Sequence, residues 1–230
     1  MAVRQLGDSP GAGRCLCRRH GGDPRPVCPP PGSPLPLVCF DEAGKELRKH
    51  KRDPHLLRPG SPQRIDAEYV RQGSANLFLW VAPYEGQRHI TATERRCAGD
   101  VAHALRDLVA AFPEAEQIVL LTDNLNVHAP ASLYKTFPRD EARRILARIE
   151  WHFTPKHGSW LNLAEVELAA LHGQCLERRI PDLPTLQGEV DAWAAERNAR
   201  RQTIAWSFTA DEAYAKLRHV YPVPNDDTVR

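Results

Sequence analysis

Two short apolar runs that each end in an acidic residue constrain the fold of this chain most strongly. "LPLVCFD" (35–41) and "EQIVLLTDN" (116–124) have the length and the continuous apolar character of buried strands. Between them, "AGDVAHALRDLVAAF" (98–112) repeats its apolar residues with the spacing of one helix face. Buried strands that alternate with amphipathic helices are typical of an α/β protein.

The remaining segments extend this pattern. "SANLFLWVAP" (74–83) and "QRHITATER" (87–95) are predicted to be strands joined by a turn, and "IEWHFTP" (149–155) is predicted to be another strand. Residues 45–64 are basic and broken by proline, which predicts a long loop or an irregular hairpin. Helices are expected over 139–150, 161–178, 183–200 and 209–221. We therefore expect a mixed sheet, in which an antiparallel meander is extended by crossover-linked parallel strands, with helices on both faces.

The ends of the chain differ from its middle. Residues 1–34 are rich in Gly, Pro, Arg and Cys and have almost no apolar periodicity, so we expect a disordered, low-complexity segment. One folded domain is expected over 35–222, followed by a flexible tail over 223–230. A zinc site in the first segment is disfavoured because its Cys-x-Cys spacing suits structural zinc poorly; its ligands would be Cys15, Cys17, His20 and Cys28.

Composition excludes several classes of protein. The 31 Lys and Arg residues nearly balance the 29 Asp and Glu residues, so any nucleic-acid footprint must be local. The longest apolar runs are too short to span a membrane, and no secretory signal is visible. The six cysteines are scattered, which argues against a disulfide framework and favours an intracellular protein.

Two aspartates stand at the predicted strand ends. In open α/β sheets, functional sites gather at the carboxyl ends of parallel strands, so Asp41 and Asp123 come close together if their strands are neighbours. Two adjacent carboxylates repel each other unless a cation lies between them, and oxygen ligands favour Mg²⁺ or Mn²⁺. The alternative is structural, because an aspartate at a strand end often caps a turn or a helix.

Polar residues follow the same strand ends. "TDNLNVHAP" and "TPKHGSWLN" come directly after two of the predicted strands. We expect them to support a site at this edge of the sheet, through Asn124, Asn126, His128, Lys156, His157 and Asn162. For either histidine, the alternative is a hydrogen-bonded surface residue.

Two glutamates lie beside the apolar stripe of the helix predicted over 161–178. Glu165 and Glu167 fall roughly 80° to either side of the centre of that stripe. Helix geometry alone does not choose between them as a third acid.

Five segments in order resemble those of the DDE transposases of the mariner-like superfamily, with bacterial insertion-sequence family 630 as the nearest branch. They are "VCFDE", "GSANLFLWV", "LLTDNLNVHAP", "FTPKHGSWLNLAEVEL" and "RRIPDLPTL…AWAAERNAR". The resemblance implies an RNase H-like fold. It also implies that Asp41, Asp123 and Glu165 are both catalytic residues and metal ligands, since the family motif LN-x-x-E matches "LNLAE" and selects Glu165. Glu167 is then a neighbouring polar residue.

The resemblance further implies metal-dependent cleavage of DNA and strand transfer during transposition. The expected cofactor is a pair of Mg²⁺ ions, with Mn²⁺ possible, and the expected partners are transposon ends, target DNA and a second copy of the chain in a homodimer. We expect a cytoplasmic, nucleoid-associated bacterial protein without membrane contact. The family's helix-turn-helix modules are not seen in the sequence, so a truncated copy is expected. Two alternatives stay open: an inactive remnant that binds DNA or the intact transposase, and an RNase H-like nuclease with another substrate.

Basic residues cluster in two places, within 45–64 and within 178–201. Phosphate contacts from such clusters give affinity that depends on salt and not on sequence; the alternative for each cluster is a solvated face. Trp160 is expected either to stack on an unpaired base or to cover the edge of the core. The residues predicted to contact DNA are Lys49, Lys51, Arg52, Arg64, Lys156, Trp160, Arg178 and Arg179; Arg197, Arg200 and Arg201 belong to the second cluster.

Overall fold

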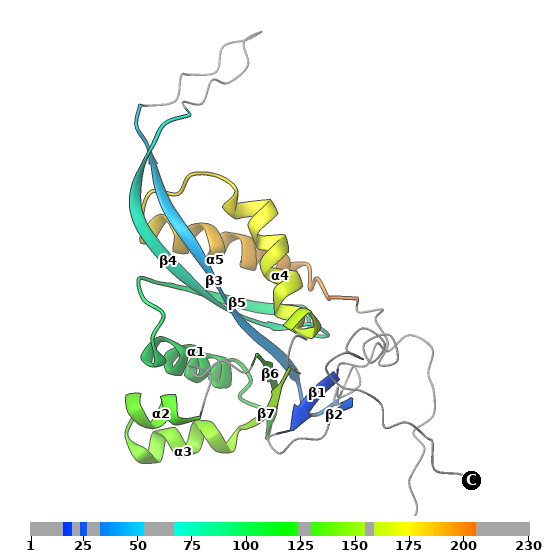
Figure 1. The fold of residues 1–230 in the computed structure, drawn as a ribbon. Coiled ribbons are helices and arrows are strands. Elements are labelled where there is room, and N and C mark those ends of the chain that lie inside the picture. Colours follow the sequence, from blue (N-terminus) through cyan, green and yellow to red (C-terminus); the bar gives the residue numbers. More distant parts are fainter. Residues whose placement is uncertain are drawn as a thin grey trace, which may run out of the picture.

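The computed structural model of the chain describes residues 16–19, 24–26, 33–52, 67–123, 130–154 and 159–205. These residues form a seven-stranded mixed sheet in the order β2-β1-β7-β6-β3-β4-β5 (Figure 1). The antiparallel meander consists of β3 (Leu37–His50), β4 (Tyr69–Ala82) and β5 (Gln87–Thr93). On its other side β3 pairs in parallel with β6 (Ile118–Thr122), which pairs in parallel with β7 (Ile149–Phe153). The predicted mixed sheet is confirmed.

Helices cover both faces of this sheet. One face carries α1 (Ala98–Ala111), α2 (Ala131–Thr136) and α3 (Arg139–Ala147). The other carries α4 (Leu163–Leu171), which continues as a π-helix (His172–Leu176), and α5 (Leu183–Ala199). The predicted α/β class, an RNase H-like sheet between two helical layers, is therefore confirmed.

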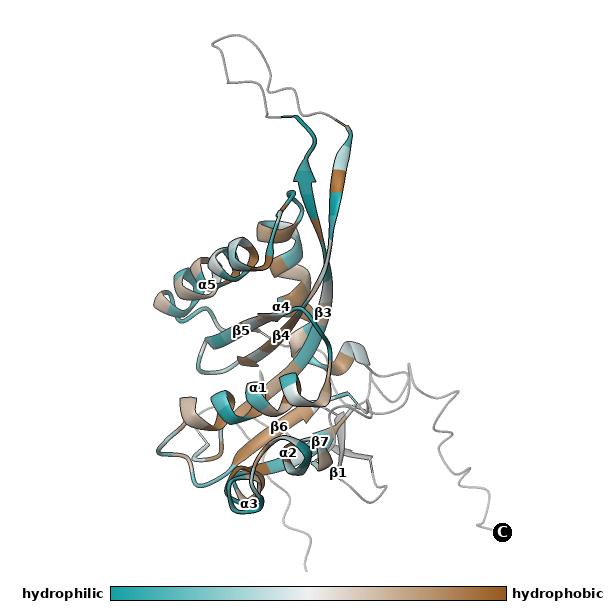
Figure 2. Cartoon of the chain, turned by 90° about the vertical axis from the view of Figure 1, so that its left-hand side faces the viewer, coloured by the Kyte–Doolittle hydropathy of each residue, from teal (hydrophilic) through white to brown (hydrophobic). Residues whose placement is uncertain are grey.

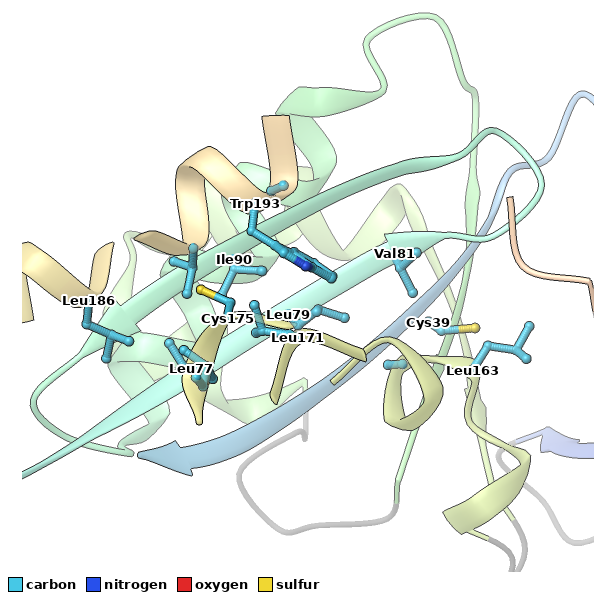
Figure 3. Packing of buried hydrophobic residues seen from close by; sticks show 14 of the residues in the cluster. Cys39, Leu77, Leu79, Val81, Ile90, Leu163, Leu171, Cys175, Leu186 and Trp193 are labelled. Atoms are coloured by element: carbon cyan, nitrogen blue, oxygen red, sulfur yellow. The ribbon is translucent and has the colours of Figure 1, made fainter. Parts of the chain in front are cut away.

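Each helical layer has its own core. On the α4 side, Leu171 of α4 and Trp193 of α5 lie close to Leu79 and Ile90, and Leu163 of α4 lies close to Cys39 (Figure 3). The whole of β6 is buried, and its successive residues enter the two cores in turn. A strand buried on both faces is continuously apolar, which explains why the run "IVLL" was recognisable in the sequence.

The strands β3 and β4 continue together well beyond the rest of the sheet (Figure 1). They stay paired as far as His50 and Tyr69, with one irregularity between Leu47 and Arg48. We call residues 45–52 and 67–73 the basic arm; its outer part is largely hydrophilic (Figure 2). Of the two structures predicted for 45–64, the irregular hairpin is thus confirmed for 45–50, while residues 53–66 lie outside the described residues.

Two short strands were not predicted. β1 (Leu16–Arg19) pairs with β2 (Pro24–Pro26) and with β7, within the segment that was expected to be disordered. The sequence did not indicate these strands, because a segment that pairs with the edge of β7 through its backbone groups needs no apolar pattern. Apart from residues 33 and 34, the rest of 1–34 lies outside the described residues.

The helices differ from prediction mainly at their ends. α2 was missed because it has only six residues, too few to show a helical period. The helix predicted from residue 161 is preceded by a 3₁₀ turn (Ser159–Leu161), and α4 itself begins after its N-cap Asn162. The helix predicted over 209–221 and the tail over 223–230 lie outside the described residues. None of the helices in the described ranges has both the length and the apolar composition needed to cross a membrane.

Candidate active site

Asp41 and Asp123 occupy equivalent places on neighbouring parallel strands. The parallel pairing of β3 with β6 runs to Cys39 and Leu121, both of which face the core on the α4 side. Each aspartate lies two residues further along, so the two-residue period of a strand directs both side chains toward α4. The proximity predicted for these two strand ends follows from the register.

Asn162 connects α4 to the end of β3. As the N-cap of α4, its Oδ1 accepts a hydrogen bond from the backbone N–H of Ala164 at 3.2 Å. Its Nδ2 donates to the carbonyl oxygen of Phe40 at 2.9 Å and, at 3.4 Å, to Oδ2 of Asp41. Because Asn162 is fully buried, these contacts fix where α4 starts relative to Asp41. Of the predicted supporting residues, Asn162 therefore does lie at the site.

The carboxyl group of Asp41 has an unusual electrostatic environment. Burial raises its pKa to about 7, and the negative charges of Asp123, Glu42 and Glu165 raise the pKa in the same direction. The hydrogen bond that Asp41 Oδ1 accepts from the backbone N–H of Glu42, at 2.8 Å, acts against this rise. The structure thus brings Asp41, Asp123 and Glu165 near enough for their charges to interact.

The two glutamates of α4 have different surroundings. Glu165 lies in the first turn of α4, is partly exposed and interacts electrostatically with Asp41. Glu167 is only 1% exposed and lies between two guanidinium groups. Its Oε1 is 2.7 Å from Nε of Arg88 and 2.8 Å from Nε of Arg197, and Nη2 of Arg197 donates to Oε2 at 3.2 Å. Helical phase left the two glutamates equivalent, whereas in the fold Glu167 already has two cationic partners and Glu165 interacts with Asp41.

The chemistry of the three acids suits a divalent cation. They offer oxygen ligands only, which Mg²⁺ and Mn²⁺ prefer, and a cation would relieve the repulsion that raises the pKa of Asp41. Within the described ranges, however, no three His, Cys, Asp or Glu side chains are gathered closely enough to hold a metal ion. The three carboxylates are nevertheless ligands of the kind that binds Mg²⁺ or Mn²⁺.

Several predicted site residues cannot be placed. The supporting residues Asn124, Asn126, His128, Lys156 and His157 lie outside the described residues, as does Arg64. Trp160 is described: it lies in the 3₁₀ turn just before α4 and is partly buried. This position is compatible with either function expected for its ring.

The predicted DNA-contacting residues fall into two groups. Lys49, Lys51 and Arg52 are exposed on the basic arm, where Lys51 also pairs with Glu68 at 2.7 Å. Arg178 is exposed and paired with Glu189. Arg179 is instead engaged with the arm, because its guanidinium donates to Nδ1 of His50 and to the carbonyl oxygens of residues 67 and 68, at 3.0–3.1 Å.

Two arginines of the second basic cluster are paired with glutamates, which the sequence alone did not indicate. Arg197 is bound to Glu167, and Arg200 pairs with Glu196 one helical turn away at 2.6 Å. The role of Arg88 was missed entirely. Nothing in the local sequence marks an arginine at the start of a strand as the partner of an acid far along the chain.

A mixed sheet of this order between two helical layers defines an RNase H-like domain. The sequence profile of a family described as "DDE superfamily endonuclease" matches residues 36–187. The chain belongs to the DDE superfamily of endonucleases, as the motifs quoted above predicted.

Several solved structures are similar to this chain. The Mos1 mariner paired-end complex with Mn is 22% identical, with a TM-score of 0.47 over 74% of this chain and 52% of that one. A pre-cleavage Mos1 transpososome is 18% identical, with a TM-score of 0.49 over 74% and 55%. A simian T-cell lymphotropic virus intasome bound to PP2A regulatory subunit B56 gamma is 16% identical, with a TM-score of 0.39 over 78% and 53%. This chain thus spans about half the length of the mariner chains that it matches. A search of curated proteins gave no match.

Proposed function

We propose that residues 35–222 form the catalytic domain of a DDE transposase of the mariner-like superfamily, which cleaves DNA strands and joins them to a target. The proposal assigns catalysis to Asp41, Asp123 and Glu165. The observation that supports it is the parallel register of β3 and β6, which ends both strands at the same edge of the sheet with Asp41 and Asp123 two residues further on, together with the electrostatic interaction of Glu165 with Asp41. Membership of the DDE superfamily supports the class of reaction.

In this proposal the three carboxylates hold two Mg²⁺ ions, or Mn²⁺ in their place. When bound, the metal ions supply activation of the attacking oxygen and stabilisation of the leaving oxygen. Asp41 must be ionised to take part, and Asn162 orients it through the contact with Oδ2. The N-cap geometry of Asn162 then places Glu165 three residues further on, in the first turn of α4, on the side that interacts with Asp41.

The proposed partners are transposon ends and target DNA, with a second copy of the chain completing the DNA complex. The basic arm supports this because Lys49, Lys51 and Arg52 present exposed positive charge to a polyanion. A bacterial cytoplasmic location at the nucleoid follows from such a function. The other predicted contacts, Arg64, Lys156, Trp160, Arg178 and Arg179, remain part of the proposal.

Strand nicking on labelled DNA that carries the matching transposon end tests the proposal directly. Nicking should require Mg²⁺ or Mn²⁺ and should fall by several orders of magnitude in Asp41→Asn, Asp123→Asn and Glu165→Gln. Asp107→Asn is the matched control, since Asp107 is exposed on α1, which packs on the opposite face of the sheet, and this variant should nick like wild type.

Three outcomes separate the alternatives. Nicking that persists without divalent metal contradicts the mechanism. Binding to DNA without nicking under either metal identifies the non-catalytic remnant. Cleavage of RNA–DNA hybrids in preference to transposon ends identifies a nuclease with another substrate.

A further inference from the structure

Glu167 stands at the centre of a buried charged cluster that joins three elements. Arg88 comes from β5 and Arg197 from α5, and both face the carboxylate on α4. The side chains of Arg88, Glu167 and Arg197 are 0%, 1% and 13% exposed. We call these three residues the clamp. It lies outside the set of acids assigned to catalysis, and the proposed reaction does not use it.

Each arginine of the clamp has further partners besides Glu167. Arg88 is tied to the C-terminal end of α5: Asn198 Oδ1 accepts from its backbone N–H at 2.9 Å, and Asn198 Nδ2 donates to its carbonyl oxygen at 2.8 Å. The Nη2 of Arg88 donates to the carbonyl oxygen of Gln202 at 2.5 Å. Arg197 lies 4.7 Å from the ring centroid of Trp193. The clamp is therefore supported by hydrogen bonds with Asn198 and Gln202 and by a ring contact with Trp193.

The clamp and Asn162 hold α4 on either side of Glu165. Asn162 fixes the N-terminus of α4 to β3, three residues before Glu165, and Glu167 fixes the helix to β5 and α5, two residues after it. The two attachments point about 140° apart around the helix axis, since they are five residues apart at about 100° each. A helix held at two such points resists both rotation about its axis and sliding along it.

Charged contacts do this better than apolar packing. Arg197 meets Glu167 through two parallel hydrogen bonds, a geometry that fixes direction as well as distance. Apolar contacts around α4, by contrast, constrain its position but carry little directional preference. Buried ion pairs are often no more stabilising than apolar residues of the same shape, so their presence points to a requirement for orientation.

We infer that the clamp is a positioning device for the third acid: Arg88 and Arg197, acting on Glu167, fix the direction of the Glu165 carboxylate toward Asp41. This inference rests on the proposed function. Glu167 is a positioning residue, since its carboxylate is occupied by the two guanidinium groups. Outer residues that orient metal ligands commonly change metal affinity by about 10- to 100-fold when they are altered.

Direct Mn²⁺ binding to the purified full chain, measured by calorimetry or by electron paramagnetic resonance without DNA, tests the inference. Glu167→Gln should weaken Mn²⁺ binding by about tenfold or more. Arg197→Lys keeps the charge but loses the paired hydrogen bonds, so it should weaken Mn²⁺ binding in the same direction. Should Glu167→Gln fail to fold, Arg197→Lys carries the test.

Val190→Ala is the control for a merely structural role. Val190 is fully buried in α5 and belongs to the same core, but its aliphatic side chain can form neither a hydrogen bond nor an ion pair with the clamp. It should lower the thermal midpoint while leaving Mn²⁺ affinity at the wild-type value. An unchanged Mn²⁺ affinity in Glu167→Gln or Arg197→Lys, or an equal loss in Val190→Ala, overturns the inference.

Asp41→Asn separates this inference from the proposed function. Wild-type binding that is lost in Asp41→Asn but unchanged in both clamp variants contradicts the clamp alone. A wild-type chain that binds no Mn²⁺, or whose binding is unaffected by Asp41→Asn, contradicts the metal site itself and the clamp with it.

Discussion

When no cation is bound, ionisation of the buried Asp41 carboxyl group destabilises the folded protein. Asp41 is 9% exposed, and its carboxyl group interacts with the charges of Asp123, Glu42 and Glu165. Its pKa lies at about 7 in the folded chain and near 3.8 in an unfolded one. Between these values Asp41 binds more protons in the native state than in the unfolded state, so its contribution to the stability of the metal-free protein falls as pH rises from about 4 to about 7.

Asp41→Asn should therefore stabilise the metal-free chain in a pH-dependent way. The gain in unfolding free energy should reach about 2–4 kcal/mol at pH 8 and be much smaller at pH 4.5, because an amide has no charge to bury. Urea denaturation in the presence of a chelator measures it, with Asp107→Asn as the exposed comparison. A gain of equal size at both pH values would show that burial does not raise the pKa of Asp41.

The acids themselves could be predicted, but their surroundings could not. Asp41 and Asp123 follow apolar runs that mark strand ends, and the motif around Glu165 marks the third acid. The difference between Glu165 and Glu167 depends on Arg88 and Arg197, which lie 79 and 30 residues from Glu167. Such pairing is created by the tertiary fold, so helical phase contains no record of it.

At the scale of elements, the core strands and long helices could be predicted because burial imposes a period on their side chains. The elements that escaped prediction are held by backbone pairing or are very short. β1 and β2 add to the edge of β7, and the first residues of β4 pair along the basic arm with exposed side chains. Neither situation requires an apolar pattern, so a polar sequence there is compatible with a strand.

Two glycines in different elements should respond to alanine in opposite ways. Gly86, in the turn between β4 and β5, has φ +66°, and an added Cβ would lie 2.4 Å from the backbone carbon of Arg201. Gly188 is within α5, where an added Cβ meets nothing within 4 Å. Gly86→Ala should destabilise the chain by more than about 1 kcal/mol, and Gly188→Ala should stabilise it by about 0.5–1 kcal/mol.

Denaturant unfolding of the two variants measures these changes. Gly86→Ala should also disturb the attachment of β5 to the end of α5, since the backbone N–H of Ile204 donates to the carbonyl oxygen of Pro83 beside the same turn. A neutral result for Gly86→Ala would mean that the turn relaxes away from α5 without loss.

At the scale of the whole molecule, the net charge of +2 conceals a strong asymmetry. The basic arm carries six Lys or Arg residues against two Glu, a net charge of +4 with histidine neutral. At the outer end of its paired strands, Arg48 and Arg179 lie 4.5 and 5.7 Å from the ring centroid of Tyr69. These contacts with Tyr69 hold part of the positive charge of the basic arm in a fixed place away from the core.

Replacing Lys49, Lys51 and Arg52 together by Gln should weaken binding to duplex DNA and flatten its dependence on salt. Each phosphate contact that is lost should reduce the slope of log K against log [salt] by about 0.9. Replacing Arg139, Arg143 and Arg144 of α3 by Gln is the matched control. These residues are exposed on a helix that covers the face of the sheet away from α4 and α5, and the charge change is the same. Equal effects of the two triple variants would assign binding to overall charge.

Since β3 is a single strand from Leu37 to His50, it also sets a distance. Asp41 and His50 belong to it and are nine residues apart, which corresponds to about 30 Å at about 3.3 Å per residue. DNA advances by about 3.4 Å for each base pair, so this span equals about nine base pairs, close to one helical turn. A duplex lying along β3 with its scissile phosphate at Asp41 would meet the arm almost one turn away, on nearly the same side of the double helix. The length of β3 would then fix the distance between the scissile phosphate and the DNA contact of the basic arm.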